Sequence, residues 1–485
     1  MNIKKNLILN SSYQLLNIIV PLITSPYLSR VIGAEGIGIY SYYNSIAYYF
    51  ILFIMLGLNN YGNRTIARVR DNKYHLSENF IEIYFMQFVT GIICISVYIF
   101  FVFFFVRDNI IVALLNIIYV LSGLFDINWF FSGLEKFKII VIRNALIKLG
   151  SLIAILSFVK QRDDLEIYVF IIAFSTLISQ ISVWPFLKRE VVWIRPQWRK
   201  IKRHIKPNLV LFIPVIAVSL YKIMDKIMIG LLSTKEEVGF YENSERIINI
   251  PQALINSLGT VMLPRITNLL AQGKQKKSKQ YTRDSMQYAM IMSMGAAFGL
   301  IGISTNFATW FFGDEFDECA ILIAFLAPTI IFNAWANVIR TQYLIPLNKD
   351  KSYIVSVSLG AIVNLIINYM LIGKLGAFGA VIGTIIAEFV VMFVQTLYVY
   401  KEIEVIKYIK DNILFLFSGC IMFGVTKLVS FMELNGLIKL VLQIATGAVV
   451  YLSVGMLLLA LVDRDRAKYI FNSLVNRNEK NRRKN

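Results

Sequence analysis

Long apolar runs dominate this chain and alternate with short polar loops. A run of at least about 18 apolar residues with few charges is typical of a membrane-spanning helix, because the hydrocarbon core needs about 20 residues at a rise of 1.5 Å each. The pattern predicts fourteen such helices, at 8–29, 38–61, 80–105, 109–132, 137–159, 165–187, 207–231, 238–264, 285–311, 319–344, 352–373, 377–400, 412–431 and 437–461. We therefore expect an all-α polytopic membrane protein.

Composition supports this expectation. The chain has 485 residues, of which 57% are hydrophobic, and a soluble domain with that content would expose large apolar patches. The first apolar segment has the charge pattern of a signal peptide. However, Asn10, Gln14 and Asn17 interrupt it and no small-residue cleavage site follows, so we predict that it stays attached as the first helix.

Positive charge is distributed unevenly between the loops. The net charge is +19, and most of the 49 Lys and Arg residues fall in the N-terminus, the even-numbered loops and the C-terminal tail. The positive-inside rule then places both termini in the cytoplasm. The acidic loop 313–318 is expected to face outward. The basic loops are interpreted as orientation signals that also attract anionic lipid headgroups, and not as a nucleic-acid interface.

The chain shows signs of internal repetition. The tripeptide "GIY" at 38–40 returns as "GFY" at 239–241, an offset of 201 residues, and the same offset relates Arg64 to Arg265. Both arginines follow the cytoplasmic end of the second helix in their half. The repeat predicts two parallel six-helix lobes around a central cavity, followed by two further helices.

The expected domain boundaries follow from this count. The lobes are predicted at 1–187 and 207–400, joined by a basic cytoplasmic linker at 188–206. The last two helices lie in 401–462, and a basic tail occupies 463–485. No loop is long enough to hold a separate catalytic domain.

Polar residues within the predicted helices are the main functional candidates, because an ionisable group in the membrane is costly unless it faces a wet cavity or a partner. A small excess of basic residues among them favours an anionic substrate. Together with Arg30 and Arg64, the residues predicted to line the cavity are Asn17, Asn44, Arg143, Lys148, Lys222, Asp225, Lys226, Glu242, Glu245, Arg246, Asn249, Asn337, Arg340 and Glu388.

Structural alternatives stay open for several of these positions. The Asn and Gln stripes can serve as hydrogen-bonding glue between helices. Asp225 can pair with Lys222 or Arg246. Gly33, Gly36 and Gly38 are expected to permit a tight turn, beside which Arg30 can be an interfacial anchor. The tyrosines of the helix at 38–61 suit either sugar stacking or the interfacial aromatic belt.

Depth separates the charged candidates. Lys148 and Glu388 fall near the middle of their predicted helices, where snorkelling is difficult. Arg340 and Glu82 lie near cytoplasmic ends and are expected to snorkel to the headgroups. His204 falls in a predicted cytoplasmic loop and is expected to be solvated.

The sequence holds no phosphate-cradling Gly-rich loop, no metal-ligand cluster and no nucleophile–base pattern. Its three cysteines show no framework spacing. We therefore expect no cofactor, no bound metal and no enzymatic activity.

Four segments carry a resemblance to a known family: "PLITSPYLSRVIGAEGIGIY" (21–40), "LGLNNYGNRTIARVR" (56–70), "DINWFFSGLEKFKIIVIRN" (126–144) and "YKIMDKIMIGLLSTKEEVGFYENSERI" (221–247). The chain resembles the bacterial polysaccharide flippases of the Wzx type, which transport repeat units of O-antigen and capsule. They form a branch of the multidrug/oligosaccharidyl-lipid/polysaccharide exporter superfamily. The resemblance spans at least the first twelve predicted helices.

The resemblance implies a function and partners. It implies that an undecaprenyl-diphosphate-linked oligosaccharide moves from the cytoplasmic to the outer leaflet of the bacterial plasma membrane by alternating access, for capsular or O-antigen-type polysaccharide. Arg30 and Arg64 match arginines of the family's first two helices, whereas Lys222, Asp225 and Arg246 match its charged sites less closely. The implied partners are membrane lipids, a polysaccharide polymerase and a chain-length regulator, without nucleic acid.

Three other functions compete with this one. A cation-coupled drug or metabolite antiporter of the same superfamily would use Glu388 or Asp225 as its cation site. A membrane glycan polymerase would need a large external loop with catalytic residues, and the predicted external loops are short. A structural scaffold conflicts with the charges at mid-membrane depth.

Overall fold

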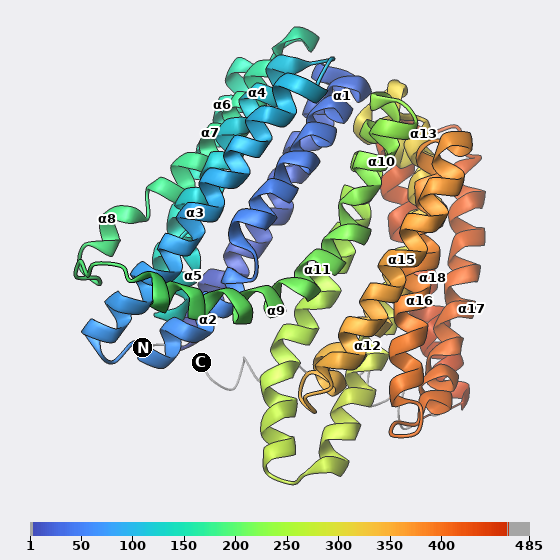
Figure 1. Cartoon of the computed structure of the whole chain (residues 1–485). Helices are drawn as coiled ribbons and strands as arrows, with labels where there is room; N and C mark the ends of the chain where they lie inside the picture. The colour runs from blue at the N-terminus through green and yellow to red at the C-terminus, as the bar shows by residue number, and fades with distance from the viewer. Residues whose placement is uncertain (1–2, 463, 465–485) are drawn as a thin grey trace, which may run out of the picture. The chain divides into compact units, whose positions relative to one another are not determined.

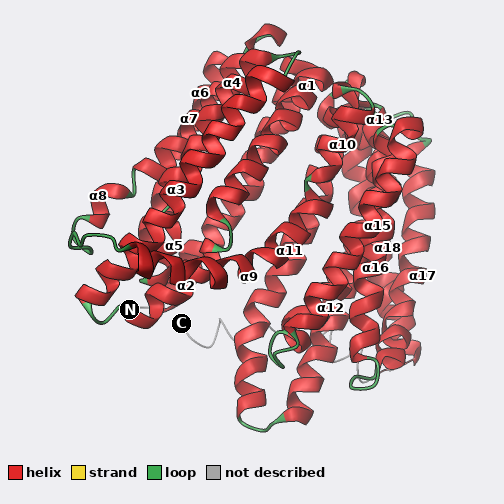
Figure 2. Ribbon diagram, in the orientation of Figure 1, coloured by secondary structure: helices red, strands yellow, loops and turns green. Residues whose placement is uncertain are grey.

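The computed structural model of this chain describes the backbone of residues 3–462 and 464, and the side chains of 16–462 and 464. These residues form helices joined by short loops, with no strand among them (Figures 1 and 2). The all-α expectation is confirmed. Asn10 and Gln14 lie outside the described side chains.

The first half of the chain contains nine α-helices and one short 3-10 turn. They are α1 (Ile3–Met55), α2 (Leu58–Val69), α3 (Lys73–Phe105), α4 (Ile110–Phe125), α5 (Asn128–Gly133), α6 (Phe137–Phe158), η1 (Arg162–Asp164), α7 (Leu165–Ile181), α8 (Trp184–Leu187) and α9 (Trp198–Lys222).

The second half begins at α10 and includes a π-helical turn, η3, directly after α14. Its elements are α10 (Met224–Leu232), α11 (Lys235–Ala271), α12 (Gln275–Phe312), η2 (Asp314–Phe316), α13 (Glu318–Leu326), α14 (Pro328–Ile339), η3 (Arg340–Leu344), α15 (Asp350–Leu375), α16 (Ala377–Val399), α17 (Val405–Ser430) and α18 (Gly436–Val462).

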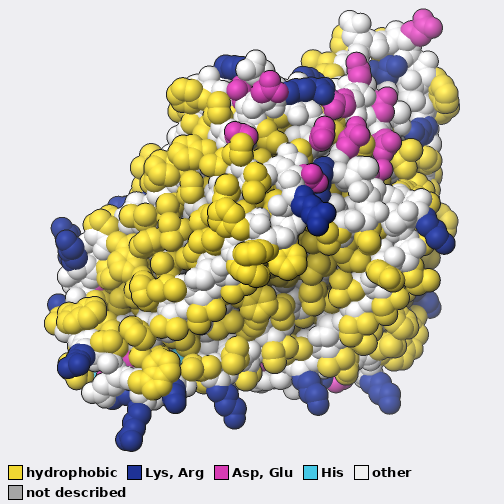
Figure 3. Space-filling model, turned by 45° about the horizontal axis from the view of Figure 1, so that its top comes forward, with side chains coloured by type: hydrophobic (Ala, Val, Ile, Leu, Met, Phe, Trp, Pro, Cys, Tyr) yellow, Lys and Arg dark blue, Asp and Glu magenta, His cyan; other side chains and the backbone are white. Residues whose placement is uncertain are grey.

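Thirteen helical segments of the described chain are long and apolar enough to cross a membrane. The first, Leu16–Val69, has 54 residues, which is more than twice the bilayer requirement. It joins the greater part of the first predicted span, 8–29, to the second, 38–61, in one helical segment. Figure 3 shows hydrophobic side chains over most of the face in view, with Lys and Arg along its lower margin. The chain is a multi-pass membrane protein.

The predicted turn between the first two spans is found at one glycine. Gly33 interrupts the helical backbone of α1 with φ 71° and ψ 179°, a conformation that is costly for residues with a Cβ. Gly36 and Gly38 are helical. The glycine turn that was expected over three positions is therefore confirmed at Gly33 alone.

The chain divides into two compact units. One comprises Met1–Asn243 with Ala361–Gly383, and the other comprises Ser244–Gly360 with Thr384–Asn485. Helices α11, α15 and α16 each contribute to both units. The predicted lobes and their linker at 188–206 stay a prediction, as does the cavity between the lobes.

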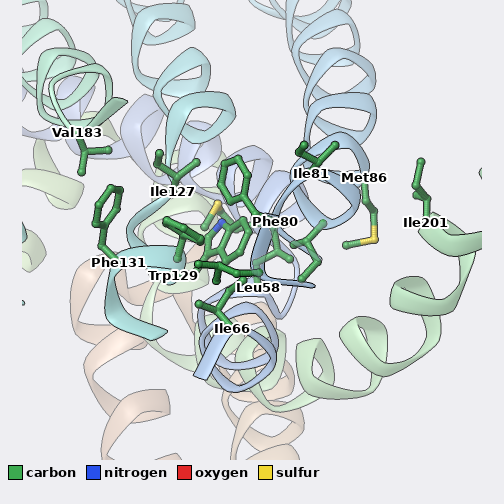
Figure 4. Packing of buried hydrophobic residues seen from close by; sticks show 14 residues of the cluster. Leu58, Ile66, Phe80, Ile81, Met86, Ile127, Trp129, Phe131, Val183 and Ile201 are labelled. Atoms are coloured by element: carbon green, nitrogen blue, oxygen red, sulfur yellow. The ribbon is translucent and has the colours of Figure 1, made fainter. Parts of the chain in front are cut away.

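A buried apolar cluster fixes α2 within the first unit. Leu58 and Ile66 of α2 crowd against Trp129 of α5 and Phe80 of α3, and all four side chains are at most 3% exposed (Figure 4). Gly62 permits this packing, because an added Cβ there would come within 2.5 Å of the Trp129 ring. The cluster therefore holds the exposed face of α2, which carries Arg64, in a defined position.

Two segments that are related by the offset of 201 contact each other within the first unit. An added Cβ at Gly38 would collide with the Lys235 carbonyl oxygen, and one at Gly239 would collide with the Ala34 carbonyl oxygen. The pairs 34/235 and 38/239 both differ by 201, so the two contacts are equivalent. Reciprocal contacts of this kind are the signature of a two-fold axis between two repeats, and they support the predicted internal repetition.

Two ion pairs also lie at positions related by the offset of 201, with the acidic and basic partners exchanged. Glu82 of α3 accepts from Arg203 of α9 over 2.8 Å, while Arg283 of α12 donates to Asp411 of α17 over 2.7 and 2.9 Å. Positions 82 and 283 again differ by 201. In each half, the helix that follows the second span is thus joined to a later segment by a carboxylate–arginine pair.

Two expectations about side-chain exposure were wrong. Glu82 does not snorkel: it is 2% exposed and bound by Arg203 and by His204, whose Nε2 lies 2.9 Å from Glu82 Oε2. His204 is not solvated, since it is also 2% exposed. The prediction failed because α9 continues through the expected loop and covers the start of α3.

Candidate functional site

Asp225 is the centre of a buried polar network in the first unit. It lies in the first turn of α10 and is 1% exposed. Its two carboxylate oxygens accept from the Tyr241 hydroxyl and from the Asn368 amide, each over 2.6 Å. Asn368 also donates to Asn364 one turn earlier on α15. A buried carboxylate needs such donors, because desolvation without hydrogen bonds is costly.

A second polar group lies close by in sequence. Lys226 Nζ is 2.5 Å from Glu242 Oε2, and the Ser41 hydroxyl donates to the same oxygen over 2.9 Å. Ser41 and Glu242 are related by the offset of 201, as are the two glycines that contact nearby backbone. Three of the predicted cavity residues, Asp225, Lys226 and Glu242, thus lie close to the contact between the two repeats.

Lys148 and Asn17, both predicted for the cavity, are in direct contact. Lys148 Nζ donates to Asn17 Oδ1 over 2.7 Å, and both side chains are half-buried. This places a cation of α6 beside the polar stripe of α1. The partner is a neutral amide, which orients the ammonium without cancelling its charge.

Arg143 belongs to a separate network between α5, α6 and α7. Its Nη2 donates to Asn128 Oδ1 over 3.0 Å and to Asn144 Oδ1 over 2.7 Å. Asn128 in turn donates to Gln180, and Ser179 donates to Asn144. Arg143 is 9% exposed, and these contacts join α5, α6 and α7 through hydrogen bonds.

Arg64 lines a basic cavity of about 670 Å³ between α2 and α9. Arg64 and Arg68 lie one helical turn apart on α2, and Arg203 and Lys206 face them from α9. Arg203 is paired with Glu82. Arg64, Arg68 and Lys206 have no carboxylate within 4.0 Å among the residues with described side chains.

The other residues that line this basic cavity are apolar or neutral. Val69, Pro207, Val210 and Leu211 line it, and Val210 is 57% exposed. The Tyr61 hydroxyl lies 2.6 Å from His204 Nδ1. The cavity therefore combines uncompensated cations with an apolar wall, an arrangement suited to an amphiphile with an anionic head.

Asn337, Arg340 and Glu388, three of the predicted residues that belong to the second unit, have different surroundings. Asn337 donates to Asn256 of α11, and an added Cβ at Gly259 would come within 2.5 Å of Asn337 Oδ1. Arg340 lies over the Tyr353 ring at 5.5 Å from its centroid. Glu388 is buried on α16, with 6% of its surface exposed.

The other candidates differ in exposure. Arg30, Arg64, Lys222 and Asn249 are exposed, whereas Asn44, Glu245 and Arg246 are half-buried. Arg30 also donates to the Pro26 carbonyl over 3.1 Å. That all sixteen candidates line one cavity stays a prediction.

The tyrosines of the second predicted span are mostly engaged with protein groups. Tyr49 donates to the Ser219 carbonyl over 3.0 Å, and Tyr43 donates to the Asp108 carbonyl. The Lys235 ammonium lies 3.3 Å from the Tyr42 ring centroid, a close cation–π contact. These contacts fit a packing role for the aromatic face.

The sequence analysis did not identify several residues of the Asp225 network and of the basic cavity. Arg68 follows Arg64 by four residues, and Asn364 and Asn368 show the same spacing on α15, so a helical-face search would have found them. Arg203 and Lys206 were assigned to a loop. Their contribution to the basic cavity depends on tertiary contacts between α2 and α9, which no local pattern indicates.

Comparison with known proteins adds to this geometry. The profile of the family described as "Polysaccharide biosynthesis protein" matches residues 3–270, which is more than half of the chain. The sequence is 24% identical over 418 residues to a protein of Escherichia coli (strain K12) named "Putative O-antigen transporter", with 82% of this chain and 97% of that protein covered.

Two further similarities point the same way. A Haloferax volcanii protein named "Probable low-salt glycan biosynthesis flippase Agl15" is 25% identical over 246 residues, covering 49% of this chain and 50% of that protein. Among solved structures, "Lipid II flippase MurJ, inward closed conformation" has a TM-score of 0.72 at 15% identity, with 94% of this chain and 99% of that chain covered. The last similarity shows a shared fold.

Proposed function

Because the chain belongs to the polysaccharide biosynthesis protein family, we propose that it is a flippase for undecaprenyl-diphosphate-linked oligosaccharide repeat units. It moves them from the cytoplasmic to the outer leaflet of the bacterial plasma membrane by alternating access. The repeat units then serve the assembly of a capsular or O-antigen-type polysaccharide, with a polymerase and a chain-length regulator as downstream partners. The activity is transport and not catalysis.

The basic cavity between α2 and α9 is the observation that carries this proposal. A lipid diphosphate needs cations for its oxygens, and arginine offers five donors in a fork that fits phosphate. Arg64, Arg68 and Lys206 supply such groups, and the wall formed by Val210 and Leu211 suits the start of a prenyl chain. The names of the relatives, which refer to O-antigen transport and to a glycan biosynthesis flippase, support the same substrate class.

Deletion of the gene tests the function. In a strain without a substitute flippase, we expect loss of surface polysaccharide and accumulation of lipid-linked repeat units on the cytoplasmic leaflet. Accumulation is measured by access of an impermeant glycosidase or lectin to inverted and right-side-out vesicles. Normal surface polymer in the deletion strain would refute the assignment.

Variants that remove positive charge test the basic cavity between α2 and α9. Arg64→Gln with Arg68→Gln is expected to lower surface polysaccharide by about tenfold or more at normal protein abundance, since 1.4 kcal/mol of lost binding corresponds to a factor of ten. Arg199→Gln with Lys202→Gln removes the same charge from exposed positions of α9 outside the cavity, and should keep normal polymer. Equal losses in both pairs would indicate a general charge effect and exclude a phosphate site.

A second candidate function rests on Asp225. A buried carboxylate in an apolar helix is a candidate to take up a proton or sodium ion in a cation-coupled antiporter, and Asp225 is 1% exposed. In that case, everted vesicles would show proton- or sodium-driven export of cationic dyes that is lost in Asp225→Asn. Absence of such export in vesicles with active polysaccharide transport would exclude it.

A further inference from the structure

A second cavity, of about 330 Å³, lies entirely within the second unit. It is formed where the end of α11, the start of α12, the π-helical turn η3 and the loop before α17 come together. Its lining residues are mostly polar or charged and include Ser278, Lys279, Thr282, Gln342, Tyr343, Lys401 and Glu402. None of these residues belongs to the basic cavity of α2 and α9.

Gln342 is a buried amide side chain that lines this cavity. It is 1% exposed, and both its amide oxygen and its amide nitrogen have no hydrogen-bond partner in the described part of the chain. An unpaired buried amide costs free energy that replacement with an apolar residue would avoid. Its position in a π-helical turn is also unusual, since such turns occur frequently at functional sites. Gln342 thus offers one donor group and one acceptor to a ligand.

The charges around the cavity are mainly positive. Lys279 donates to the main-chain oxygen of Glu402 over 2.7 Å. The Glu402 carboxylate is engaged by Lys349 and by the Tyr343 hydroxyl. Lys401 is exposed, with no hydrogen bond or ion pair to any residue whose side chain is described. The cavity has three lysines on or beside it and one carboxylate that is already occupied, so it favours an anion.

The corresponding position in the first half is occupied by an ion pair of the chain itself. There Glu78 of α3 forms an ion pair with Lys200 of α9, and only about 30 Å³ remains open. Position 279 is related to position 78 by the offset of 201, and it holds a lysine in place of the glutamate. Lys401 faces the cavity as Lys200 does in the first half. The first half therefore supplies a carboxylate at this position, and the second half has a lysine in its place.

We propose that this cavity binds the phosphoglycerol headgroup of an anionic phospholipid. The phosphate lies between Lys401 and Lys279, and the Gln342 carboxamide bonds a phosphate oxygen through its NH₂ and a headgroup hydroxyl through its oxygen. A lipid is favoured over a soluble phosphate ester because Leu270, Leu347 and Ile403 also line the cavity. The cavity also lies at the ends of candidate spans, at the level where headgroups are found. This site is independent of the proposed transport function.

Thermal unfolding of the full-length purified protein in detergent tests the proposal, because a ligand that binds the folded state raises Tm. Phosphatidylglycerol is expected to raise the Tm of the wild type more than phosphatidylcholine does. Lys401→Gln and Gln342→Leu should each lose about half or more of that phosphatidylglycerol-specific increase. Lys410→Gln removes one exposed charge from α17 outside the cavity and should keep the full increase.

Three results would overturn the proposal. The first is an equal phosphatidylglycerol response in wild type, Lys401→Gln and Gln342→Leu, which would indicate nonspecific attraction. The second is an equal loss in Lys410→Gln. The third is full replacement of the lipid effect by soluble glycerol 3-phosphate at the same concentration, which would identify a soluble phosphate ester as the ligand. Because Lys401 is exposed, its variant is informative even if Gln342→Leu alters folding.

Discussion

Lys148 illustrates, at the scale of single residues, a cation whose charge is oriented but not cancelled. Its Nζ donates to the neutral Asn17 amide over 2.7 Å. If the ammonium binds an anionic substrate, Lys148→Ala should lower surface polysaccharide by about tenfold, equivalent to about 1.4 kcal/mol of lost binding. Lys148→Arg should retain most of the polymer because the charge remains. Both are measured by immunoblotting of surface polymer at matched protein abundance.

Asn17→Asp is the sharper control for this prediction. A carboxylate at position 17 would form an ion pair with Lys148, so it would lower transport without destabilising the protein. Unchanged transport in both Asn17→Asp and Lys148→Ala would contradict the role of Lys148 and leave it a tolerated polar contact.

Glu402 leads to a prediction about pH. The ion pair with Lys349, and then the hydrogen bond from Tyr343, lower the pKa of this carboxyl below its ordinary value. Glu402 therefore contributes stability above the carboxyl pKa of the unfolded chain, and this contribution is lost as pH falls through the lower pKa of the folded state. The Tm difference between wild type and Glu402→Gln should thus shrink on acidification below about pH 4.5. A difference that stays constant down to about pH 3 would contradict this.

The contact between Gly38 and Gly239 matters at the scale of whole elements, since it lets α1 and the start of α11 approach at backbone distance. An added methyl at either position meets a carbonyl oxygen of the other segment, and backbone atoms cannot move aside cheaply. Gly38→Ala and Gly239→Ala should each destabilise the protein by about 1–3 kcal/mol, the usual cost of overpacking. The measurement is the Tm of detergent-purified protein.

Gly150 is a matched control for these substitutions. It is a helical glycine of α6 with open space around its added Cβ. Gly150→Ala should leave Tm unchanged or raise it, because alanine has the higher helix propensity by about 1 kcal/mol. A similar loss of Tm in all three variants would show that the reciprocal contact is not the cause.

The distribution of charge leads to a prediction for the whole molecule, namely its orientation in the membrane. After Cys94, Cys319 and Cys420 are replaced by serine, single cysteines are introduced as Glu315→Cys and Gln272→Cys. In intact cells, an impermeant thiol reagent should label the cysteine at 315, within the acidic loop 313–318, and not the one at 272, in the basic loop between α11 and α12.

Permeabilised cells provide the control for accessibility, because both positions should be labelled there. The reverse pattern in intact cells, with 272 labelled and 315 protected, would contradict the positive-inside assignment and place both termini outside.

The general architecture was predictable from local composition. The hydrocarbon thickness sets the length of an apolar helix, so the spans follow from run lengths alone, with the first two found as one helix bent at Gly33. The offset of 201 was visible in a few residues, and it returns in the contacts of Gly38 with Lys235 and of Gly239 with Ala34. Charges inside spans also identified Asp225 and Lys148 as candidates, since their cost in a membrane depends on the residue type itself.

The partners of these residues were decided only by the tertiary structure. Glu82 and Arg203 are 121 residues apart, and their pairing with buried His204 depends on α9 covering α3. Asn368 reaches Asp225 from 143 residues away. The unpaired amide of Gln342 is apparent only once three segments enclose it. A residue's type fixes the cost of burying it, whereas the group that offsets this cost depends on which distant segments the fold brings to it.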